Sequence, residues 1–229
     1  MRIIVPFLIL LVAQNLVYGQ ARADFFAQRL GADDLLVNGE VYLPAHPKAK
    51  GHPYYPGAEW ATGAVYVKGR VYPEVSLLYD LVLDRPLLRT RLRDGQTVQL
   101  ILLPSLVDSF RIGPHLFVHA RAVGLPAPAS GYFEEMYRGN HSLLIRHETH
   151  FVATYSNVSP FGSYASLRSR SFLLAAGQLV PIPNQRAFLA HFSDKKDPIR
   201  QFLRQHRIHY ARATHTQLHQ LMQFCDVLP

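Results

Sequence analysis

An alternation of apolar and polar residues with a period of two extends from Thr62 to about Ile182 and constrains the fold more than any other feature. In one such segment Leu116, Val118 and Ala120 alternate with residues of the opposite face. Successive side chains of a strand point to opposite faces of a sheet, so the pattern is typical of strands with one buried and one wetted face. It therefore predicts an antiparallel sheet.

Short turn signals such as Lys68-Gly69, Asp94-Gly95 and Gly139-Asn140 divide this region into strands. The expected strands lie near 63–67, 75–83, 87–93, 96–103, 107–112, 115–122, 132–138, 142–150, 171–176 and 178–182. Because their connections are short, neighbouring strands should pair in order as a meander. A sheet of about ten strands must protect its edges, so a curved sheet, a sandwich and a barrel all remain open.

The last 45 residues change to a helical period. Asn184 is a candidate helix cap, Ile199 and Leu203 fall on one helix face, and Thr214 with Gln217 forms a capping box. These signals predict two to three C-terminal helices from about residue 184. The fold class is therefore α+β and mainly β, with residues 62–229 as a single domain.

The first 61 residues differ from this domain. Residues 1–19 combine Arg2, an apolar run and small residues before Gln20, which is typical of a cleaved signal peptide rather than of a buried helix or a retained anchor. Residues 20–61 are expected to hold a short helix near 22–30 and an irregular proline-rich loop. No later segment is a long enough apolar run to cross a bilayer as a helix. The mature chain is therefore expected to be periplasmic or secreted.

Three stretches of the chain resemble a family of secreted proteins from Bacteroidota. They are GAVYVKGRVYPEVSLLYD at 63–80, GYFEEMYRGNHSLLIRHE at 131–148 and the segment 171–208, which contains the DKK helix. The shared motifs are structural. The resemblance therefore implies a β-rich fold and a periplasmic or outer-surface location, and it implies no particular chemistry.

The common catalytic motifs are missing from the sequence. It contains no G-x-S-x-G elbow, no P-loop, no dinucleotide fingerprint and no H-E-x-x-H. Glu134 and Glu135 are neighbours on a strand and point to opposite faces, which makes them a poor acid–base pair. Cys225, the single cysteine, can close no intrachain disulfide and lies on the apolar stripe of the last helix, so it is expected to be a buried hydrophobe. No catalytic residue and no cofactor is assigned.

The chain has 12 histidines, which raises the question of a metal site. His215 and His219 are four apart on the last helix, a spacing that can hold one ion. His147 and His150 face opposite sides of a strand and cannot share a metal, and His206 is expected at the edge of the core. Because no Cys, Asp or Glu stands at a matching spacing, surface histidines are the favoured interpretation, and no metal is assigned.

Lys and Arg outnumber Asp and Glu by 24 to 16, which gives a formal charge of +8. Nucleic acid is not an expected partner of an exported protein without a binding motif, so an anionic envelope surface or an acidic glycan is preferred. Arg200, Arg204 and Arg207 share one helix face and are the candidate contact residues. A solvated charged face is nevertheless the favoured interpretation of these arginines.

The proline-rich loop concentrates aromatic side chains at Tyr54, Tyr55 and Trp60. Exposed rings of this kind could stack on a flat ligand, or they could plug the end of the β core. The leading interpretation is an exported, non-enzymatic envelope protein that binds a ligand or partner. The alternative is an envelope hydrolase or isomerase whose site is assembled from scattered residues. The oligomeric state is left open.

Overall fold

The computed structural model describes residues 36, 39–92, 95–126 and 128–228. The signal peptide predicted at 1–19 and the helix predicted near 22–30 lie outside the described residues.

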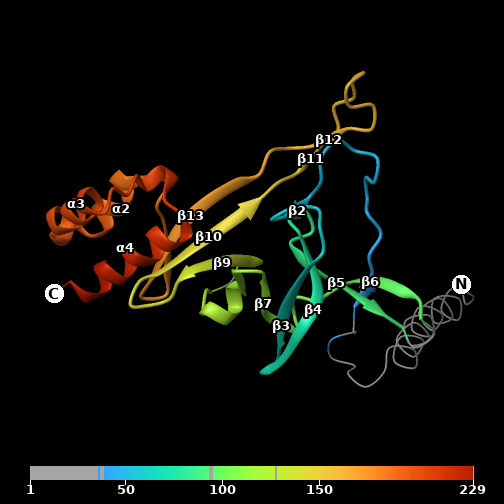
Figure 1. Cartoon of the computed structure of the whole chain (residues 1–229), viewed down its shortest axis with the longest axis horizontal. Helices are drawn as coiled ribbons and strands as arrows, with labels where there is room; N and C mark the ends of the chain where they lie inside the picture. The colour runs from blue at the N-terminus through green and yellow to red at the C-terminus, as the bar shows by residue number, and fades with distance from the viewer. Residues whose placement is uncertain (1–35, 37–38, 93–94, 127, 229) are drawn as a thin grey trace, which may run out of the picture.

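Most of the described chain forms one antiparallel sheet of 12 strands, with the order β1-β6-β5-β4-β3-β7-β8-β9-β10-β13-β14 and with β2 paired to β4 (Figure 1). The strands are β1 (Glu40–Val41), β2 (Tyr54–Tyr55), β3 (Ala61–Val67), β4 (Arg70–Asp80), β5 (Arg85–Arg91), β6 (Thr97–Ile101), β7 (Val107–Ile112), β8 (His115–His119), β9 (Tyr132–Tyr137), β10 (Ser142–Glu148), β13 (Arg168–Ala175) and β14 (Gln178–Pro181). A second, small sheet pairs β11 (Phe151–Val152) with β12 (Ser163–Tyr164). The predicted mainly β fold with C-terminal helices is confirmed. The sheet does not close into a barrel, which was one of the three shapes left open by the sequence.

The meander order holds in two runs, β3 to β6 and β7 to β10. The two runs are joined by the pairing of β3 with β7, so β6 and β7 are not neighbours. The reason is that β1 occupies the outer edge of β6, while one edge of β3 is free to accept β7.

Two strands end earlier than the sequence predicted, because a side chain at the end of each accepts hydrogen bonds from the following backbone amides. The strand expected to reach residue 83 ends at Asp80, whose Oδ1 accepts hydrogen bonds from the amides of Val82 and Leu83 at 2.9 and 3.0 Å. The strand expected at 115–122 ends at His119, whose Nδ1 accepts from the amide of Arg121 at 3.1 Å. These side-chain hydrogen bonds replace the hydrogen bonds that the backbone would otherwise make to a neighbouring strand, and the chain turns there.

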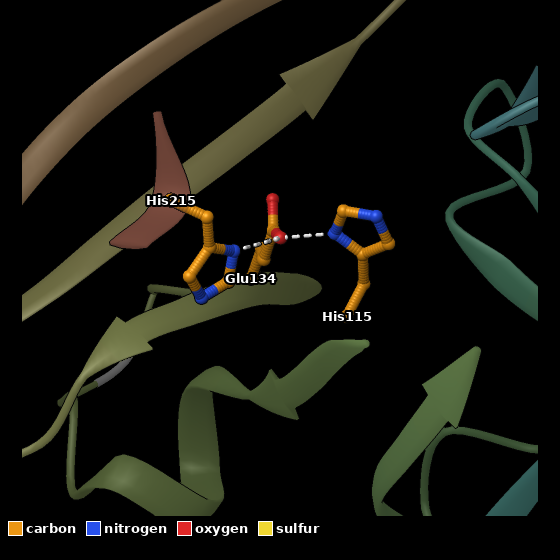
Figure 2. Close-up of side chains that lie close together, drawn as sticks. All are labelled: His115, Glu134 and His215. Carbon is orange, nitrogen blue, oxygen red and sulfur yellow. Dashed lines mark hydrogen bonds and ion pairs between the residues drawn. The ribbon is translucent and has the colours of Figure 1, made fainter. Parts of the chain in front are cut away.

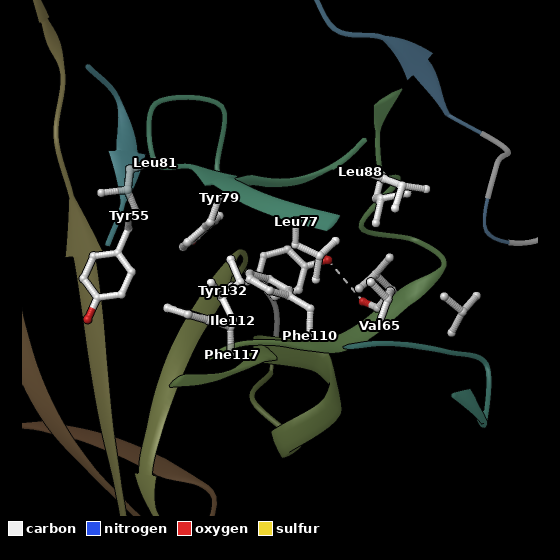
Figure 3. Packing of buried hydrophobic residues seen from close by; sticks show 13 residues of the cluster. Tyr55, Val65, Leu77, Tyr79, Leu81, Leu88, Phe110, Ile112, Phe117 and Tyr132 are labelled. Carbon is white, nitrogen blue, oxygen red and sulfur yellow. Dashed lines mark hydrogen bonds between the residues drawn. The ribbon is translucent and has the colours of Figure 1, made fainter. Parts of the chain in front are cut away.

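An aromatic core fixes the central strands relative to one another. Phe110 and Phe117 stack with their ring centroids 4.9 Å apart, and Tyr79 and Tyr132 meet Phe110 edge-on at 5.1 and 5.0 Å (Figure 3). All four rings are buried and come from β4, β7, β8 and β9. Interlocked rings tolerate little displacement, so β8 and β9, which carry the candidate site below, are held firmly.

A partly buried ion pair holds the end of β9 next to this core. The Arg146 guanidinium donates to both carboxylate oxygens of Asp84 at 3.0 and 2.7 Å and to the Tyr132 carbonyl at 2.6 Å. The Tyr79 hydroxyl donates to Asp84 at 2.5 Å. The network ties the turn between β4 and β5 to β9 and β10.

The C-terminal helices lie together at one end of the long β10–β13 pair, and β11 and β12 lie at the other (Figure 1). They are α2 (Gln185–His191), α3 (Lys196–Gln205) and α4 (His215–Val227), with the 3-10 turns η2 (Ser193–Lys195) and η3 (Tyr210–Arg212) between them. Asn184 caps α2 through the Ala187 amide at 2.9 Å, and Thr214 and Gln217 form the predicted capping box. None of the helices in the described residues is both long and apolar enough to cross a membrane.

The helices and the sheet share a second apolar core. Cys225 is buried there on α4 together with Leu221 and Met222, as predicted. His206, expected at the core edge, is instead exposed, because α3 ends at Gln205 and His206 is its C-cap residue. Its ring nevertheless lies 4.1 Å from that of Phe202.

Candidate functional site

Glu134 is a carboxylate buried in the middle of the sheet. It lies on β9, where it pairs with Phe117 of β8 and Ile145 of β10, and it is only 3% exposed. An isolated carboxylate at such a position would be very unfavourable, so its partners decide what the position can do.

One carboxylate oxygen of Glu134, Oε2, is held by two donors from the protein. His147 Nε2 lies 2.7 Å away, and the Tyr55 hydroxyl donates from 3.3 Å. Because a carboxylate oxygen only accepts, His147 donates from Nε2, and its Nδ1 lies 2.8 Å from the Ser169 hydroxyl, which can donate to it. The ring of Tyr55 stacks on that of His147 at 4.2 Å. These contacts fix the orientation of the carboxylate.

The other oxygen, Oε1, faces two further histidines (Figure 2). His115 Nδ1 lies 2.5 Å from Oε1, and His215 Nδ1 lies 3.8 Å from it. One ligand atom from each of the three side chains lies within 4.8 Å of the other two. The side chains of His115 and His215 are 25% and 39% exposed, so this side of Glu134 is open to solvent.

The electrostatic surroundings favour an ionised Glu134. Burial alone raises the pKa of the carboxyl group, but the hydrogen bonds and charges of His147 and His115 lower it by more, and the net pKa lies below its usual range. Burial and the Glu134 charge raise the pKa of Tyr55, which keeps its hydroxyl protonated as a donor. The site therefore presents a negative oxygen to two imidazoles.

Two imidazole nitrogens and one carboxylate oxygen form a ligand set suited to Zn²⁺ and similar divalent transition metals. Two ligands of one tetrahedral zinc ion lie roughly 3.3 Å apart, given metal–ligand distances of about 2.0–2.1 Å. The pair of His115 and Glu134 at 2.5 Å would have to widen, and the pair of His215 and Glu134 at 3.8 Å would have to narrow. Both changes are within the reach of side-chain rotation.

Three separate elements bring these groups together. His115 opens β8 after the turn at Gly113, whose φ of +56° suits glycine. Glu134 lies inside β9, and His215 is the first residue of α4, directly after the Thr214 cap. The three residues are far apart in the sequence, so no motif within one segment predicts that they cluster, and the sequence analysis missed the site.

One signal did point to Glu134. Glu134 and Glu135 were predicted to face opposite sides of a strand, and Glu135 indeed pairs with Arg138 at 2.7 Å while Glu134 points to the histidines. A glutamate on the buried face of a strand is a candidate for function. His219, whose spacing from His215 could also hold one ion, is not part of the cluster, and its ring lies edge-on to Tyr137 at 5.2 Å.

Of the three aromatic residues predicted to contact a ligand, only Tyr55 belongs to this cluster. It is also part of the buried core, as the plug interpretation expected. The Tyr54 hydroxyl lies 3.0 Å from that of Tyr42, and Arg89 lies over the Trp60 ring at 5.2 Å.

The predicted basic face lies elsewhere, and only Arg200 and Arg204 are on helix α3, because the helix ends at Gln205 and Arg207 follows it with a φ of +51°. The exposed side chains of Arg200, Arg204 and Arg207 line a groove of about 570 Å³ beside α3, with Gln185 among the other lining residues. Arg200 also forms an ion pair with Asp197 at 3.2 Å. These arginines form a surface that is separate from the Glu134 cluster.

Comparison with known proteins finds no family model, no curated protein and no solved structure that matches this chain. The candidate site therefore rests on its own geometry, and the resemblance to the Bacteroidota family stays a prediction.

Proposed function

We propose that this protein binds one divalent first-row transition metal, with Zn²⁺ as the first candidate. The ligands are His115 Nδ1, Glu134 Oε1 and His215 Nδ1. The observation that carries the proposal is the convergence of one ligand atom from each of these three side chains within 4.8 Å, around a buried carboxylate whose pKa is lowered. Buried carboxylates are usually paired, and here two of the pairing groups are good metal ligands.

The surroundings of the three ligands support metal binding. His147 and Tyr55 occupy the oxygen of Glu134 that faces away from the ligand set, at 2.7 and 3.3 Å. Such outer partners orient a ligating carboxylate and strengthen metal binding. The partial exposure of His115 and His215 gives an ion a path of entry and leaves room for water or another ligand on it.

A metal ion would be the ligand of the non-enzymatic binding role expected from the sequence. The exported, envelope location and the anionic partner are separate proposals that concern other parts of the chain. Metal binding requires neither of them.

A second candidate function follows from the short bond between His115 Nδ1 and Glu134 Oε1, 2.5 Å. A carboxylate that holds one imidazole nitrogen leaves the other free to accept a proton, and Nε2 of His115 is turned away from Glu134 (Figure 2). This arrangement would serve the hydrolase or isomerase alternative. The two functions compete, because a metal on Nδ1 replaces that hydrogen bond.

The test is a metal titration of the tag-free mature protein after treatment with a chelator. Calorimetry with Zn²⁺ and the visible absorption of Co²⁺ should both report one equivalent. His115→Gln and His215→Gln should each weaken binding at least about tenfold, because each removes one of three ligands. His209→Gln and His219→Gln are the matched controls and should bind as the unmodified protein does.

Binding that is absent, or that is unchanged in both ligand variants, would contradict the proposal. The pair of His115 and Glu134 would then remain as a candidate proton-transfer dyad.

A further inference from the structure

The loop 153–162 between β11 and β12 presents large apolar side chains to solvent. Tyr155, Val158 and Phe161 are 66%, 73% and 52% exposed. The loop projects beyond the small β11–β12 sheet, at the end of β10 and β13 away from the helices (Figure 1). Single exposed apolar residues are common, but a group of them on one projecting loop marks an interaction surface. We call this loop the apolar tip.

The apolar tip stands on an ordered base. Lys50 forms two backbone hydrogen bonds with this segment, from its amide to the Gly162 carbonyl at 3.0 Å and from the Tyr164 amide to its carbonyl at 2.9 Å. The ring of His46 stacks on that of Phe151 at 3.5 Å, and Phe151 pairs with Tyr164. The base therefore holds the apolar side chains outward.

The segments that build the apolar tip carry only basic charges. The two segments that build it, 41–58 and 149–171, have no Asp or Glu, and they carry Lys48, Lys50, Arg168 and Arg170. Lys48 Nζ lies over the Phe161 ring at 5.3 Å, so positive charge and apolar surface are in direct contact. All four basic residues are exposed, and the acidic residue next to them is Glu148, which is paired with Arg170 and lies opposite Arg168 in the strand register.

We propose that the apolar tip docks on the surface of an anionic lipid bilayer. Aromatic and aliphatic side chains enter the boundary between headgroups and acyl chains, and lysine and arginine meet the lipid phosphates. A second copy of the chain is a poor occupant, because two tips of net positive charge would repel each other. Docking of this kind is peripheral, and it is independent of the proposed metal site.

The inference also places the anionic envelope partner expected from the sequence on a surface other than α3. Each basic residue near an anionic bilayer strengthens binding about fivefold. Removal of three charges at the docking surface should therefore weaken binding by about a hundredfold, whereas the same change elsewhere should have a small effect.

The experiment is flotation of the mature protein with phosphatidylcholine vesicles that do or do not contain phosphatidylglycerol. The unmodified protein should bind the anionic vesicles, and soluble glycerol phosphate should not displace it, because a free headgroup offers no apolar phase. Tyr155→Ser, Val158→Ser and Phe161→Ser together should reduce binding at least about tenfold. Val71→Ser, Val82→Ser and Val227→Ser, which are also exposed, form the matched apolar control.

Charge is tested with equal numbers of substitutions on the two surfaces. Lys48→Gln, Lys50→Gln and Arg168→Gln together should nearly abolish binding to anionic vesicles. Arg200→Gln, Arg204→Gln and Arg207→Gln together should leave most of it. The reverse result would overturn the inference and favour α3. The inference would also be overturned if the unmodified protein failed to bind anionic vesicles or if glycerol phosphate displaced it from them. Equal losses of vesicle binding in the two apolar triple variants would overturn it as well.

A fluorescent reporter checks insertion without disrupting the surface. In a Trp60→Phe background, Phe161→Trp places the single tryptophan of the chain on the apolar tip. Its emission should shift to the blue on anionic vesicles and be quenched by lipids with brominated acyl chains. An emission spectrum that does not change on vesicles would contradict insertion.

Discussion

Glu134 is the residue at which stability and function meet. In the folded protein the pKa of its carboxyl group lies below the usual range, because hydrogen bonds from His147 and His115 outweigh the effect of burial. A group with a lowered folded pKa contributes stability above its unfolded pKa and loses that contribution as the pH falls through the folded value.

Replacement of Glu134 by Gln therefore tests this contribution. At neutral pH, Glu134→Gln should lower the free energy of unfolding by about 1–3 kcal/mol, since His147 and His115 lose a charged acceptor. The difference from the unmodified protein should shrink in acid, below the lowered pKa. Urea unfolding in a pH series from neutral into the acid range measures how this difference changes. Glu148→Gln, which breaks an exposed pair with Arg170, is the control and should cost about 0–1 kcal/mol.

Cys225 allows a second prediction at the scale of one residue. Its side chain is 1% exposed, and burial raises the pKa of the thiol to about 12. The reactive thiolate is therefore both rare and inaccessible at neutral pH. We expect Cys225 to resist an aromatic disulfide reagent in the native protein and to react once urea unfolds the chain. Rapid reaction of the native protein would show that α4 is not packed against the sheet as described.

Helix α4 connects local sequence signals to the candidate site. Its capping box was predicted from Thr214 and Gln217, and the next residue after the cap is the candidate ligand His215. Thr214→Ala should cost about 1 kcal/mol of stability and should also weaken Zn²⁺ binding, because the first turn of α4 frays. Asn184→Ala, which removes the cap of α2, should cost a similar stability and leave Zn²⁺ binding unchanged. If Thr214→Ala and Asn184→Ala bound Zn²⁺ equally well, the Thr214 cap would have no role in positioning His215.

The elements could be predicted from the sequence because their signals are local. The strand at 107–112 was predicted with the bounds that it has, and the caps of α2 and α4 follow from single side chains. The pairing of β3 with β7 could not be predicted in this way. It depends on which strand edge is free after β1 has covered β6, and that is a property of the assembled sheet.

The candidate site was beyond prediction for the same reason. Local spacing singled out His215 together with His219 and placed Glu134 and Glu135 on opposite faces of a strand, but His115 joins His215 and Glu134 only when β8 and β9 pair and α4 docks on the sheet. Tyr55 was singled out as an aromatic side chain in a loop, and its role as a donor to Glu134 appears only in the folded chain. Patterns of period two and 3.6 carry no information about such long-range meetings.

At the scale of the whole molecule, the candidate site lies where the C-terminal helices meet the sheet. His115 and Glu134 belong to the sheet, and His215 belongs to the helical part, which has its own apolar core with β9, β10 and β13. A metal bound by all three would link the two parts. Because such an ion binds the folded chain and not the scattered ligands of the unfolded one, it should stabilise the whole protein.

The size of this stabilisation can be predicted. At a free Zn²⁺ concentration one hundred times the dissociation constant, binding adds about 2.7 kcal/mol. For a chain of this length that corresponds to a rise in Tm of about 5–10 °C. The rise should be lost in His215→Gln and kept in His219→Gln, since the two histidines share α4 and only His215 faces Glu134.

Backbone hydrogen exchange should slow in β8, β9 and the first turn of α4 together when Zn²⁺ is added, because linkage through one ion makes their opening a single event. Slowing confined to α4 would mean that the ion binds the helix alone, as the spacing of His215 and His219 would allow, and not the three-element site.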